Sequence, residues 1–523
     1  MSLSQNPKRL AAIDLGTNSF HMIIVELLPD MSFLVIDRAK EMIRVGDGSL
    51  LTKMLTEEAM KEGLETLLRF RKLAEQRGVE THHIIAFATS AIREAKNGGA
   101  YMETISQELG IRAGIISGDE EARLIYLAIR QAISIGNRKT LMIDAGGGSV
   151  EMMIGDSEKL YLEESKKLGV ARMYERFIKH DPPSEKEREE LETFFIEQIT
   201  PFATRAKSLG YEMAVASSGT AENIASMIFL QENGQLFESL NGNTFSRKSF
   251  QKLYDKLLPM KSSERKSIEG LDPKRADLII PGLILFDVVF RLFSLKDITI
   301  SGYALREGMV IDYLSKHIEE FRLINAIPDV RRRSVIELAR RCHWDEARSV
   351  HIANLALQLF DELQPLHGLS ARERELLDYA TLLHNIGYFI SPSGHHKHSQ
   401  YIILNGELRG FSHDEVQVIA HIARYHRKSP PKPEHATFQT LSAKHKQVVK
   451  YASAMLRVAN ALDRTHRQNV RGVKAKVSGK KIELRLTIMS DAEIEIWAVS
   501  RAKEMFEDVF ERAVSVSVEA VAD

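Results

Sequence analysis

Two short turns carry the residues of this 523-residue chain that are best suited to chemistry. The segment IDLGTNSFHMII begins at Ile13, and the segment IDAGGGSVEMMI begins at Ile143. Six of their twelve aligned positions are identical, whereas ordinary composition gives roughly one identity by chance. Each segment has the pattern of a strand, an aspartate, a glycine-containing turn and a second strand. The repeat predicts a duplicated α/β unit whose turns face each other across a cleft.

Turns of this kind can bind phosphate. Glycine lets backbone N–H groups approach a phosphate closely, and it permits positive φ angles. Side-chain hydroxyls and an amide add hydrogen-bond donors, and the candidates are Thr17, Asn18, Ser19 and Ser149. A single Asp-Gly turn is usually no more than a turn, so the prediction depends on the pairing. No G-x-x-x-x-G-K-[ST] sequence occurs, which excludes a Walker-type P-loop.

An aspartate precedes each turn, Asp14 in the first and Asp144 in the second. At an effective dielectric near 20, a carboxylate about 6 Å from a phosphate charge is repelled by roughly 3 kcal/mol. A divalent cation between them removes this repulsion, and Mg²⁺ prefers a few carboxylates, waters and phosphate oxygens. We therefore expect Mg²⁺, or another divalent cation, as cofactor.

Strands and helices alternate up to about residue 310, which predicts an α/β arrangement around the turns. The predicted strands are residues 9–13, 20–27, 32–43, 84–88, 112–116 and 140–144, and predicted helices begin at residue 56 and cover residues 101–109 and 120–135.

The pattern becomes mostly helical over residues 335–461, where Ser370 and Glu373 form a candidate capping box. Residues 472–488 predict a strand–turn–strand unit. A helix near residues 498–510 and a strand near residues 514–518 complete a small α+β cap. We therefore expect four domains, at residues 1–125, 126–312, 313–470 and 471–523.

The two turns resemble the phosphate motifs of the superfamily that unites actin, sugar kinases and heat-shock chaperones. Further motifs narrow the resemblance to the exopolyphosphatase/guanosine-pentaphosphate phosphohydrolase family. They are ATSAIREAKNG (88–98), ISGDEEARLIY (116–126), SSGTAENIA (217–225), RADLIIPG (275–282) and SGYALREGM (301–309). The resemblance implies two actin-like (ribonuclease-H-like) α/β domains around the cleft. The C-terminal region is similar to the long, four-domain members of that family.

Members of this family use water to remove a terminal phosphate from polyphosphate, or the γ-phosphate of guanosine pentaphosphate. The resemblance implies that Glu121 is the general base and that Glu151 is the second catalytic carboxylate. It further implies that Asp14, Asp144 and Glu151 organise the metal ion. The residues implied to contact phosphate are Arg93, Gly146, Gly147, Gly148, Ser218, Gly219 and Arg275.

Each of these residues also has a purely structural interpretation. Glu121 lies in the first turn of a predicted helix, where acids are favourable without catalysis. Arg93 could pair with a neighbouring acid, and Arg275 could be a surface cation. Ser218 and Gly219 could form an ordinary turn.

The C-terminal half resembles HD-type phosphohydrolases, whose H…HD…H…D skeleton binds divalent metals. The corresponding residues are His351, His384, Asn385, His421 and Asp463. Asn385 replaces the central aspartate, and a neutral amide is a poorer metal ligand. We therefore expect an all-α, HD-like domain without a second hydrolase centre, and the family resemblance implies that this domain holds substrate or forms a homodimer.

Residues 416–475 contain twelve lysines and arginines but two acids, a local net charge of +10. A long phosphate chain is a natural partner for such a surface. We call five of its residues the polyanion grip: Arg424, Arg427, Lys428, Lys444 and Lys446. The alternative is a solvated helical face whose counter-charges come from other segments.

The whole chain balances 71 basic against 71 acidic side chains. It is therefore not basic throughout, so any polyanion has to be held by a local patch, and nucleic acid is not the expected partner. The family resemblance implies inorganic polyphosphate as partner. The single cysteine, Cys342, excludes a disulfide framework and fits a cytoplasmic protein. No apolar stretch is long enough for a membrane span.

Three functional classes stay open at this point. The leading one is an exopolyphosphatase, with guanosine pentaphosphate as a further or preferred substrate. The second is a phosphotransferase or ATPase of the actin-like superfamily. The third is a binding protein with a decayed site, which the presence of Asp14, Glu121, Asp144 and Glu151 together argues against.

Overall fold

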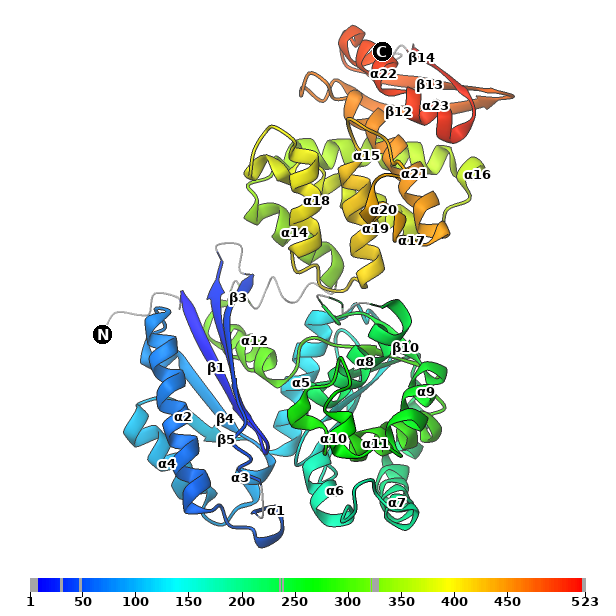
Figure 1. The fold of residues 1–523 in the computed structure, drawn as a ribbon. Helices are drawn as coiled ribbons and strands as arrows, with labels where there is room; N and C mark the ends of the chain where they lie inside the picture. The colour runs from blue at the N-terminus through cyan, green and yellow to red at the C-terminus, as the bar shows by residue number, and fades with distance from the viewer. Residues whose placement is uncertain are drawn as a thin grey trace. The chain divides into compact units, whose positions relative to one another are not determined.

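The computed structural model describes residues 8–28, 32–46, 49–234, 237, 239–319, 321 and 329–519 (Figure 1). The chain divides into two compact units, Met1–Val330 and Arg331–Asp523. The finer predicted boundaries lie inside helix α5 (Gly118–Ala132), helix α12 (Leu305–His317) and strand β12 (Val470–Ser478). The division into four domains therefore stays a prediction.

A five-stranded sheet of order β3-β2-β1-β4-β5 organises the first part of Met1–Val330. Its strands are β1 (Arg9–Leu15), β2 (Phe20–Leu27), β3 (Phe33–Glu41), β4 (Ile84–Ala88) and β5 (Arg112–Ile115). Strand β1 pairs antiparallel with β2 and parallel with β4. Because side chains alternate along a strand, Ala11 and Ile13 of β1 pack on one face, while Leu10 and Ala12 pack on the other.

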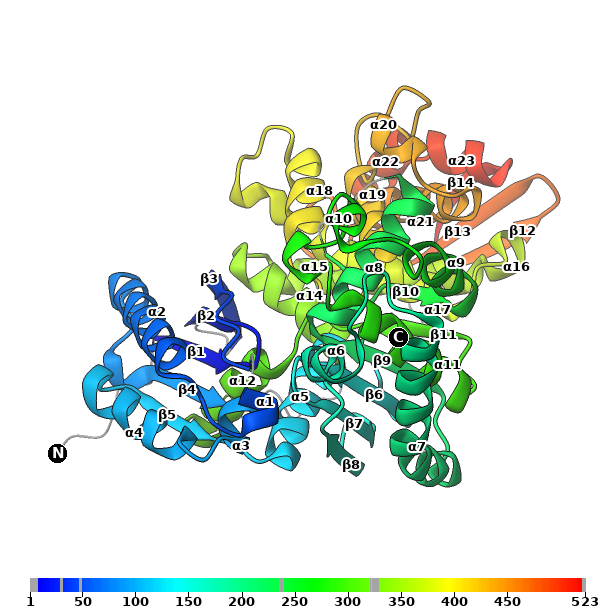
Figure 2. The same cartoon turned by 60° about the horizontal axis from the view of Figure 1, so that its bottom comes forward.

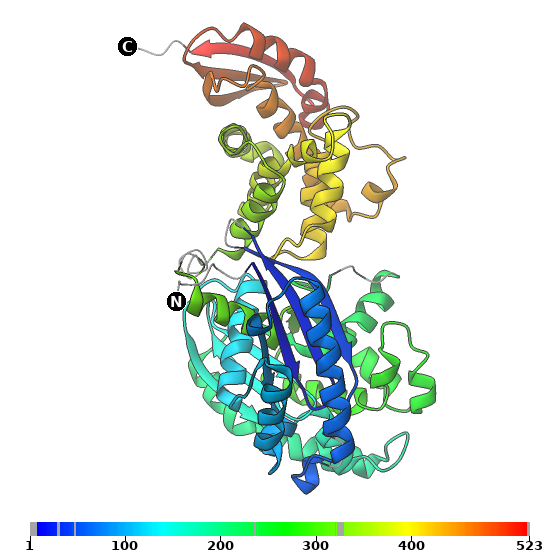
Figure 3. The same ribbon diagram turned by 90° about the vertical axis from the view of Figure 1, so that its left-hand side faces the viewer.

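Helices cover both faces of this sheet. Helices α2 (Glu57–Gln76) and α4 (Gly98–Leu109) cover the face of Ala11 and Ile13, and Figure 3 shows α2 running along it. The Thr56 hydroxyl caps α2 by accepting from Ala59 N, as the predicted start at residue 56 requires.

The second sheet has six strands in the order β10-β11-β9-β6-β7-β8. They are β6 (Thr140–Ala145), β7 (Val150–Gly155), β8 (Leu160–Lys166), β9 (Met213–Ser217), β10 (Thr244–Ser246) and β11 (Asp297–Ile300). Apart from β10, the order repeats that of the first sheet, with β6 antiparallel to β7 and parallel to β9. The predicted duplication is confirmed. The helices on the outer face include α6 (Val170–Phe177), α7 (Glu185–Leu209), α8 (Ser218–Asn233), α9 (Arg247–Leu257) and α11 (Ile279–Leu292).

Helices α5 and α12 lie between the two sheets, as Figure 2 shows. One buried cluster joins them to Ala12 of the first sheet and to Met142 and Val215 of the second. Both helices therefore belong to both halves of the duplicated core, and they fix the distance between the two turns.

The unit Arg331–Asp523 is mainly helical and carries a three-stranded sheet. Its longer helices are α14 (Val330–Arg341), α15 (Glu346–Glu362), α17 (Ala371–Leu383), α18 (His395–Asn405), α19 (His413–Arg424) and α21 (Ala443–Ala461). The predicted capping box of Ser370 and Glu373 is confirmed at α17. The sheet consists of β12, β13 (Lys481–Ile488) and β14 (Ala513–Glu519), and it shares one core with the helices.

One predicted element of this unit is wrong. The single helix expected near residues 498–510 is two helices, α22 (Glu493–Ala502) and α23 (Glu504–Phe510). In the described part of the chain, no helix combines the length and apolar character that a membrane crossing requires.

Candidate active site

The two turns approach each other closely. The first joins β1 to β2, and the second joins β6 to β7. A Cβ atom added at Gly148 would lie 2.5 Å from Thr17 Oγ1, and one added at Gly147 would lie 3.4 Å from Thr17 Cβ. Glycine is therefore required at position 148, and the turns face each other as the repeat predicts.

A cavity of about 120 Å³ lies at this meeting point. The predicted site residues that line it are Asp14, Thr17, Asn18, Ser19, Glu121, Asp144, Gly146, Gly147, Gly148, Ser149, Ser218, Gly219 and Arg275. Two other predicted site residues, Arg93 and Glu151, do not line the cavity and lie behind the residues that do.

Three polar atoms of the lining are buried and lack a hydrogen-bond partner among the described residues. They are Asp14 Oδ1, Asn18 Nδ2 and Arg275 Nε. Buried polar atoms are nearly always hydrogen-bonded, so such atoms in one cavity indicate that a ligand completes it. An arginine and an amide suit an anion, whereas the carboxylate oxygen suits a cation.

The surroundings of Asp14 and Asp144, the aspartates of the two turns, disfavour the ionised carboxylate. Burial raises the pKa of Asp14 to about 7, with Arg306 opposing and Glu121 and Asp144 adding to the effect. Burial also raises the pKa of Asp144 to about 6, although Ser217 Oγ donates a hydrogen bond to Asp144 Oδ2 (2.5 Å). Burial and the neighbouring carboxyls outweigh the charge of Arg306, and a divalent cation would relieve this repulsion.

Glu121 lies in the first turn of α5, with its side chain buried against the cavity. Arg93 Nη1 donates to Glu121 Oε2 (2.8 Å) and to Ile116 O (3.0 Å). Burial raises the pKa of Glu121 to about 7, against the lowering effect of Arg93 and with a raising effect of Asp144. Arg93 thus orients Glu121 in this structure, and its predicted contact with phosphate stays a prediction.

Glu151 is opposite Asp144 in the β6–β7 pairing. Its side chain is 1% exposed and accepts a hydrogen bond from Ser165 Oγ (2.8 Å). Burial, then Glu121 and Asp144, raises its pKa well above the usual range. Glu151 therefore interacts electrostatically with both cavity carboxyls from behind the lining.

The strand-to-helix turn after β9 has an unusual backbone. Ser218 has φ = 85°, a region that residues other than glycine seldom adopt. Its hydroxyl donates to Ala145 O (3.0 Å), which ties this turn to the end of β6. Strain of this kind is concentrated at functional sites, and here it brings Ser218 and Gly219 to the cavity.

A metal ion would find its ligands in this cavity rather than in a closed protein cage. Among the described residues, three ligating groups within 4.8 Å of one another occur at Glu80, His82 and His83, a largely exposed trio of which no member lines the cavity. Asp14, Asp144 and Glu151 do not converge that closely. The residues present fit an ion that takes one or two carboxylates and completes its shell with water and phosphate oxygens.

Sequence reasoning missed several residues of the site. Arg306, at the start of α12, lines the cavity and lowers the pKa values of Asp14 and Asp144, as a nearby cation does. His21 also lines the cavity, and Ser217 holds Asp144. All three occur within quoted motifs, but no local pattern indicates which side chains of a motif enter a site.

Comparison with known proteins identifies the family. A model of the Ppx/GppA phosphatase family matches residues 24–317, and a model of Ppx/GppA phosphatase domain III matches residues 330–495. The chain belongs to the Ppx/GppA phosphatase family. The two matches together extend over both compact units.

Solved structures of this family resemble a large part of the chain. An exopolyphosphatase from Cytophaga hutchinsonii is 30% identical, with a TM-score of 0.56, over 59% of this chain and 98% of that one. The Ppx/GppA family member from Aquifex aeolicus is 25% identical, with a TM-score of 0.52, over the same shares. The fold is thus the predicted actin-like pair of α/β domains, and the protein is a phosphatase of the Ppx/GppA family.

The HD-like residues of this family member have protein partners or are buried. Arg348 Nε donates to Asp463 Oδ2 (3.3 Å), and the Asp463 side chain is fully buried. His384 Nδ1 donates to Thr381 O (2.6 Å), and burial lowers the pKa of His384 to about 4. The arginine supplies Asp463 with the positive charge that a metal supplies in an HD enzyme.

The five residues of the polyanion grip differ in whether their side chains already have partners within the protein. Lys444 pairs with Glu373 (3.0 Å), which supports the alternative of counter-charges from another segment. Arg424 donates to Gln400, Arg427 to His395, and Lys446 to Gln439. Lys428 is exposed, so it is the best remaining candidate for a polyanion contact, and Arg427 adjoins it in the chain.

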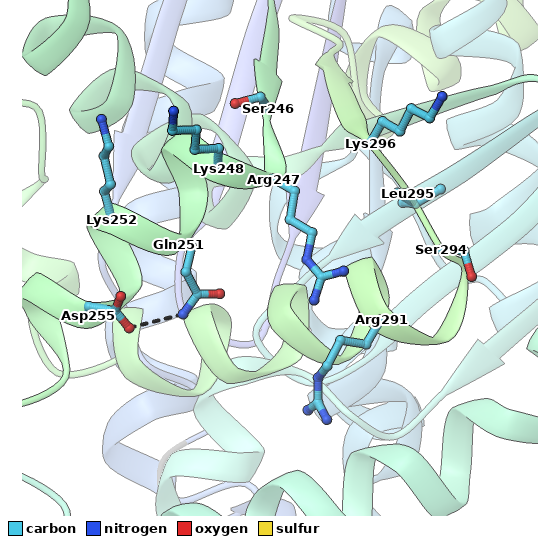
Figure 4. Close-up of a pocket in the computed structure, with 10 residues that line it drawn as sticks. All are labelled: Ser246, Arg247, Lys248, Gln251, Lys252, Asp255, Arg291, Ser294, Leu295 and Lys296. Atoms are coloured by element: carbon cyan, nitrogen blue, oxygen red, sulfur yellow. Dashed lines mark hydrogen bonds between the residues drawn. The ribbon is translucent and has the colours of Figure 1, made fainter.

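A larger cavity of about 950 Å³ lies near α9 and the connection from α11 to β11 (Figure 4). Its cations are exposed and point in different directions. Arg291 pairs with Asp287 and Glu192, and Gln251 donates to Asp255. None of the buried unpartnered atoms among the described residues belongs to this cavity, so the site between the turns is the better candidate.

Proposed function

We propose that this phosphatase is an exopolyphosphatase, which uses water to hydrolyse the terminal phosphoanhydride bond of inorganic polyphosphate and releases orthophosphate. The observation that carries the proposal is the position of Glu121 in a cavity walled by two phosphate-type turns. The similarity to an exopolyphosphatase supports this substrate class.

In the proposed reaction, donors of the two turns and the Arg275 guanidinium bind the terminal phosphoryl group. Glu121 accepts a proton from the attacking water, and a pKa of about 7 suits a base that works near neutral pH. Arg93 holds the carboxylate by its Oε2 atom. Arg306 provides positive charge beside the same cavity, where charge on the departing phosphate has to be stabilised.

Asp14 and Asp144 would hold Mg²⁺, with Glu151 acting on them from behind. When bound, the ion neutralises phosphate charge and orients the nucleophilic water. It would also relieve the repulsion that raises the pKa values of the two aspartates.

Mg²⁺ should stabilise the protein more at pH 8 than at pH 5.5. Folding raises the pKa of Asp14 to about 7 and that of Asp144 to about 6. From about pH 4 up to these values the folded protein binds more protons than the unfolded chain, so the stability contributed by these groups falls as the pH rises. Above this window the carboxylates are ionised, and a cation removes their repulsion. We expect Mg²⁺ to raise Tm by about 3–6 °C at pH 8 and by less than about 1 °C at pH 5.5.

Thermal unfolding at constant ionic strength measures this difference. Asp144→Asn should lose much of the shift at pH 8, whereas Asp119→Asn, an exposed acid of α5, should keep it. Shifts of equal size at the two pH values would contradict a metal ion held by these carboxyls.

The substrate test compares phosphate release from long-chain polyphosphate, guanosine pentaphosphate and ATP, each with Mg²⁺ and with excess chelator. We expect kcat/KM for polyphosphate to exceed the other two by at least about tenfold, which is about 1.4 kcal/mol. Guanosine pentaphosphate ends in the same phosphoanhydride, and faster release from it would transfer the assignment to that alternative. Preferred turnover of ATP would favour an ATPase or phosphotransferase.

Charge reversal at Arg427 and Lys428 should weaken binding of long polyphosphate about tenfold at low salt. A long chain can bind the polyanion grip in addition to the catalytic cavity and so gains affinity through effective concentration, whereas tripolyphosphate is too short to gain it. The plot of log K against log salt has a negative slope, and the loss of two phosphate contacts should make this slope less steep by about 1–2.

Titrations of labelled long-chain polyphosphate at several salt concentrations measure both effects. Charge reversal at Lys61 and Lys72, two exposed lysines of α2 outside the grip, is the matched control. Equal losses for tripolyphosphate and the long chain would argue against the grip and for a general defect.

A further inference from the structure

His21 connects two parts of the catalytic cavity. It lies on β2 opposite Asp14 in the β1–β2 pairing, and it lines the cavity. Its Nε2 atom is 2.6 Å from Ser19 Oγ, and its Nδ1 atom is 3.1 Å from Arg306 Nη1. The imidazole therefore joins the first phosphate turn to the start of α12.

The direction of both hydrogen bonds follows from the chemistry of arginine. A guanidinium group has only N–H donors, so His21 Nδ1 must accept from Arg306. Burial, followed by the charges of Arg306, Lys40 and Arg275, lowers the pKa of His21 to about 2, so the ring is neutral. A neutral imidazole that accepts at Nδ1 carries its proton on Nε2. His21 Nε2 therefore donates to Ser19 Oγ.

This donation leaves the hydroxyl proton of Ser19 for a second acceptor. Ser19 is 5% exposed and lines the cavity. The described residues provide no other hydrogen-bond partner for its side chain. A phosphate oxygen in the cavity can accept this proton, and the donor chain from Arg306 through His21 to Ser19 polarises it in the right direction.

We propose that His21 is a positioning residue that commits the Ser19 hydroxyl proton to the bound phosphoryl group and holds the Arg306 guanidinium beside the same group. The inference rests on the proposed hydrolysis of a phosphoanhydride. His21 itself needs no contact with substrate, because it acts through Ser19 and Arg306.

A double-mutant cycle of His21→Phe and Ser19→Ala tests the proposal. We expect each single variant to lower kcat/KM for tripolyphosphate by about 10–50-fold. In the His21→Phe background, Ser19→Ala should cost less than about threefold, because the hydroxyl is no longer committed. Losses that multiply would overturn the proposal.

Two amide variants separate positioning from packing. His21→Gln retains a donor in reach of Ser19 and an acceptor for Arg306, whereas His21→Asn retains only the acceptor. The Gln variant should recover at least about half of the lost activity on a logarithmic scale and restore the effect of Ser19→Ala. Equal activity of the Gln and Phe variants, at Tm values within about 2 °C of wild type, would overturn the proposal.

Calorimetric binding of tripolyphosphate to the same proteins keeps this inference separate from the proposed function. A wild-type protein that releases no phosphate from any phosphoanhydride would refute the function. The binding cycle still reports on His21: non-additive losses of affinity support the relay, and additive losses refute it.

Discussion

Replacing Glu121 by glutamine should lower kcat for polyphosphate by about 10²–10⁴-fold, which corresponds to roughly 3–5 kcal/mol of transition-state stabilisation. Glutamine has the shape of glutamate but cannot accept the proton of the attacking water. Because Arg93 binds Oε2 of Glu121, the amide can keep this contact through its oxygen. Tripolyphosphate should therefore bind within about threefold of wild type, and the loss should appear in kcat rather than in KM.

The same helix turn provides the control. Glu120 precedes Glu121, but its carboxylate is partly exposed and pairs with Arg123 (2.7 Å). Both acids lie in the first turn of α5, so Glu120→Gln reports the effect of losing an acid there on helix stability. We expect its kcat to stay within about threefold of wild type. Near-normal turnover of Glu121→Gln would remove Glu121 as the base, and a large loss in Glu120→Gln would give the role to Glu120.

Local sequence patterns were enough to predict the architecture of the first unit. The continuous apolar runs in the segments that start at Ile13 and Ile143 give strands that are buried on both faces, and the identities between the segments gave the duplication. Short segments are enough for this prediction because strands that follow each other in the chain usually lie next to each other in the sheet. The division near residue 500 was missed because apolar residues continue on both sides of Lys503, where α22 ends and α23 begins.

The contacts inside the site depend on packing between distant segments, and the sequence does not report them. Arg93 pairs with Glu121 because α3 (Ser90–Glu94) and α5 follow neighbouring parallel strands. Glu151 lies next to Asp144 because the two residues pair directly across β6 and β7. Arg306 comes from a motif almost 300 residues after Asp14 and reaches the cavity because α12 packs between the two sheets. Motifs identify such segments, but only the fold decides which side chain of each one enters the cavity.

Replacing Asp144 by alanine should lower kcat by about 10²–10³-fold and raise the Mg²⁺ concentration for half-maximal activity at least about tenfold. Excess chelator should abolish activity of the wild-type protein. Asp144 lines the cavity at the end of β6, where Ser217 holds one of its two oxygens. Its removal would take away a negative charge and a ligand oxygen together, so the ion would bind weakly and the water would be misplaced.

Asp144→Asn distinguishes the charge from the shape of this side chain. The amide oxygen can still accept from Ser217, so hydrogen bonding at the end of β6 is retained. A loss close to that of alanine would show that charge is what the reaction needs. Because burial raises the pKa of Asp144 to about 6, the ionised carboxylate costs stability at neutral pH, and Asp144→Asn should not lower Tm in metal-free buffer. Alanine, by contrast, leaves the buried Ser217 hydroxyl without this acceptor. An unchanged Mg²⁺ requirement in both variants, or full activity in excess chelator, would refute a role of Asp144 as metal ligand. A strong loss of activity at an unchanged or higher Tm would instead leave catalysis, rather than folding, as the function of this carboxylate.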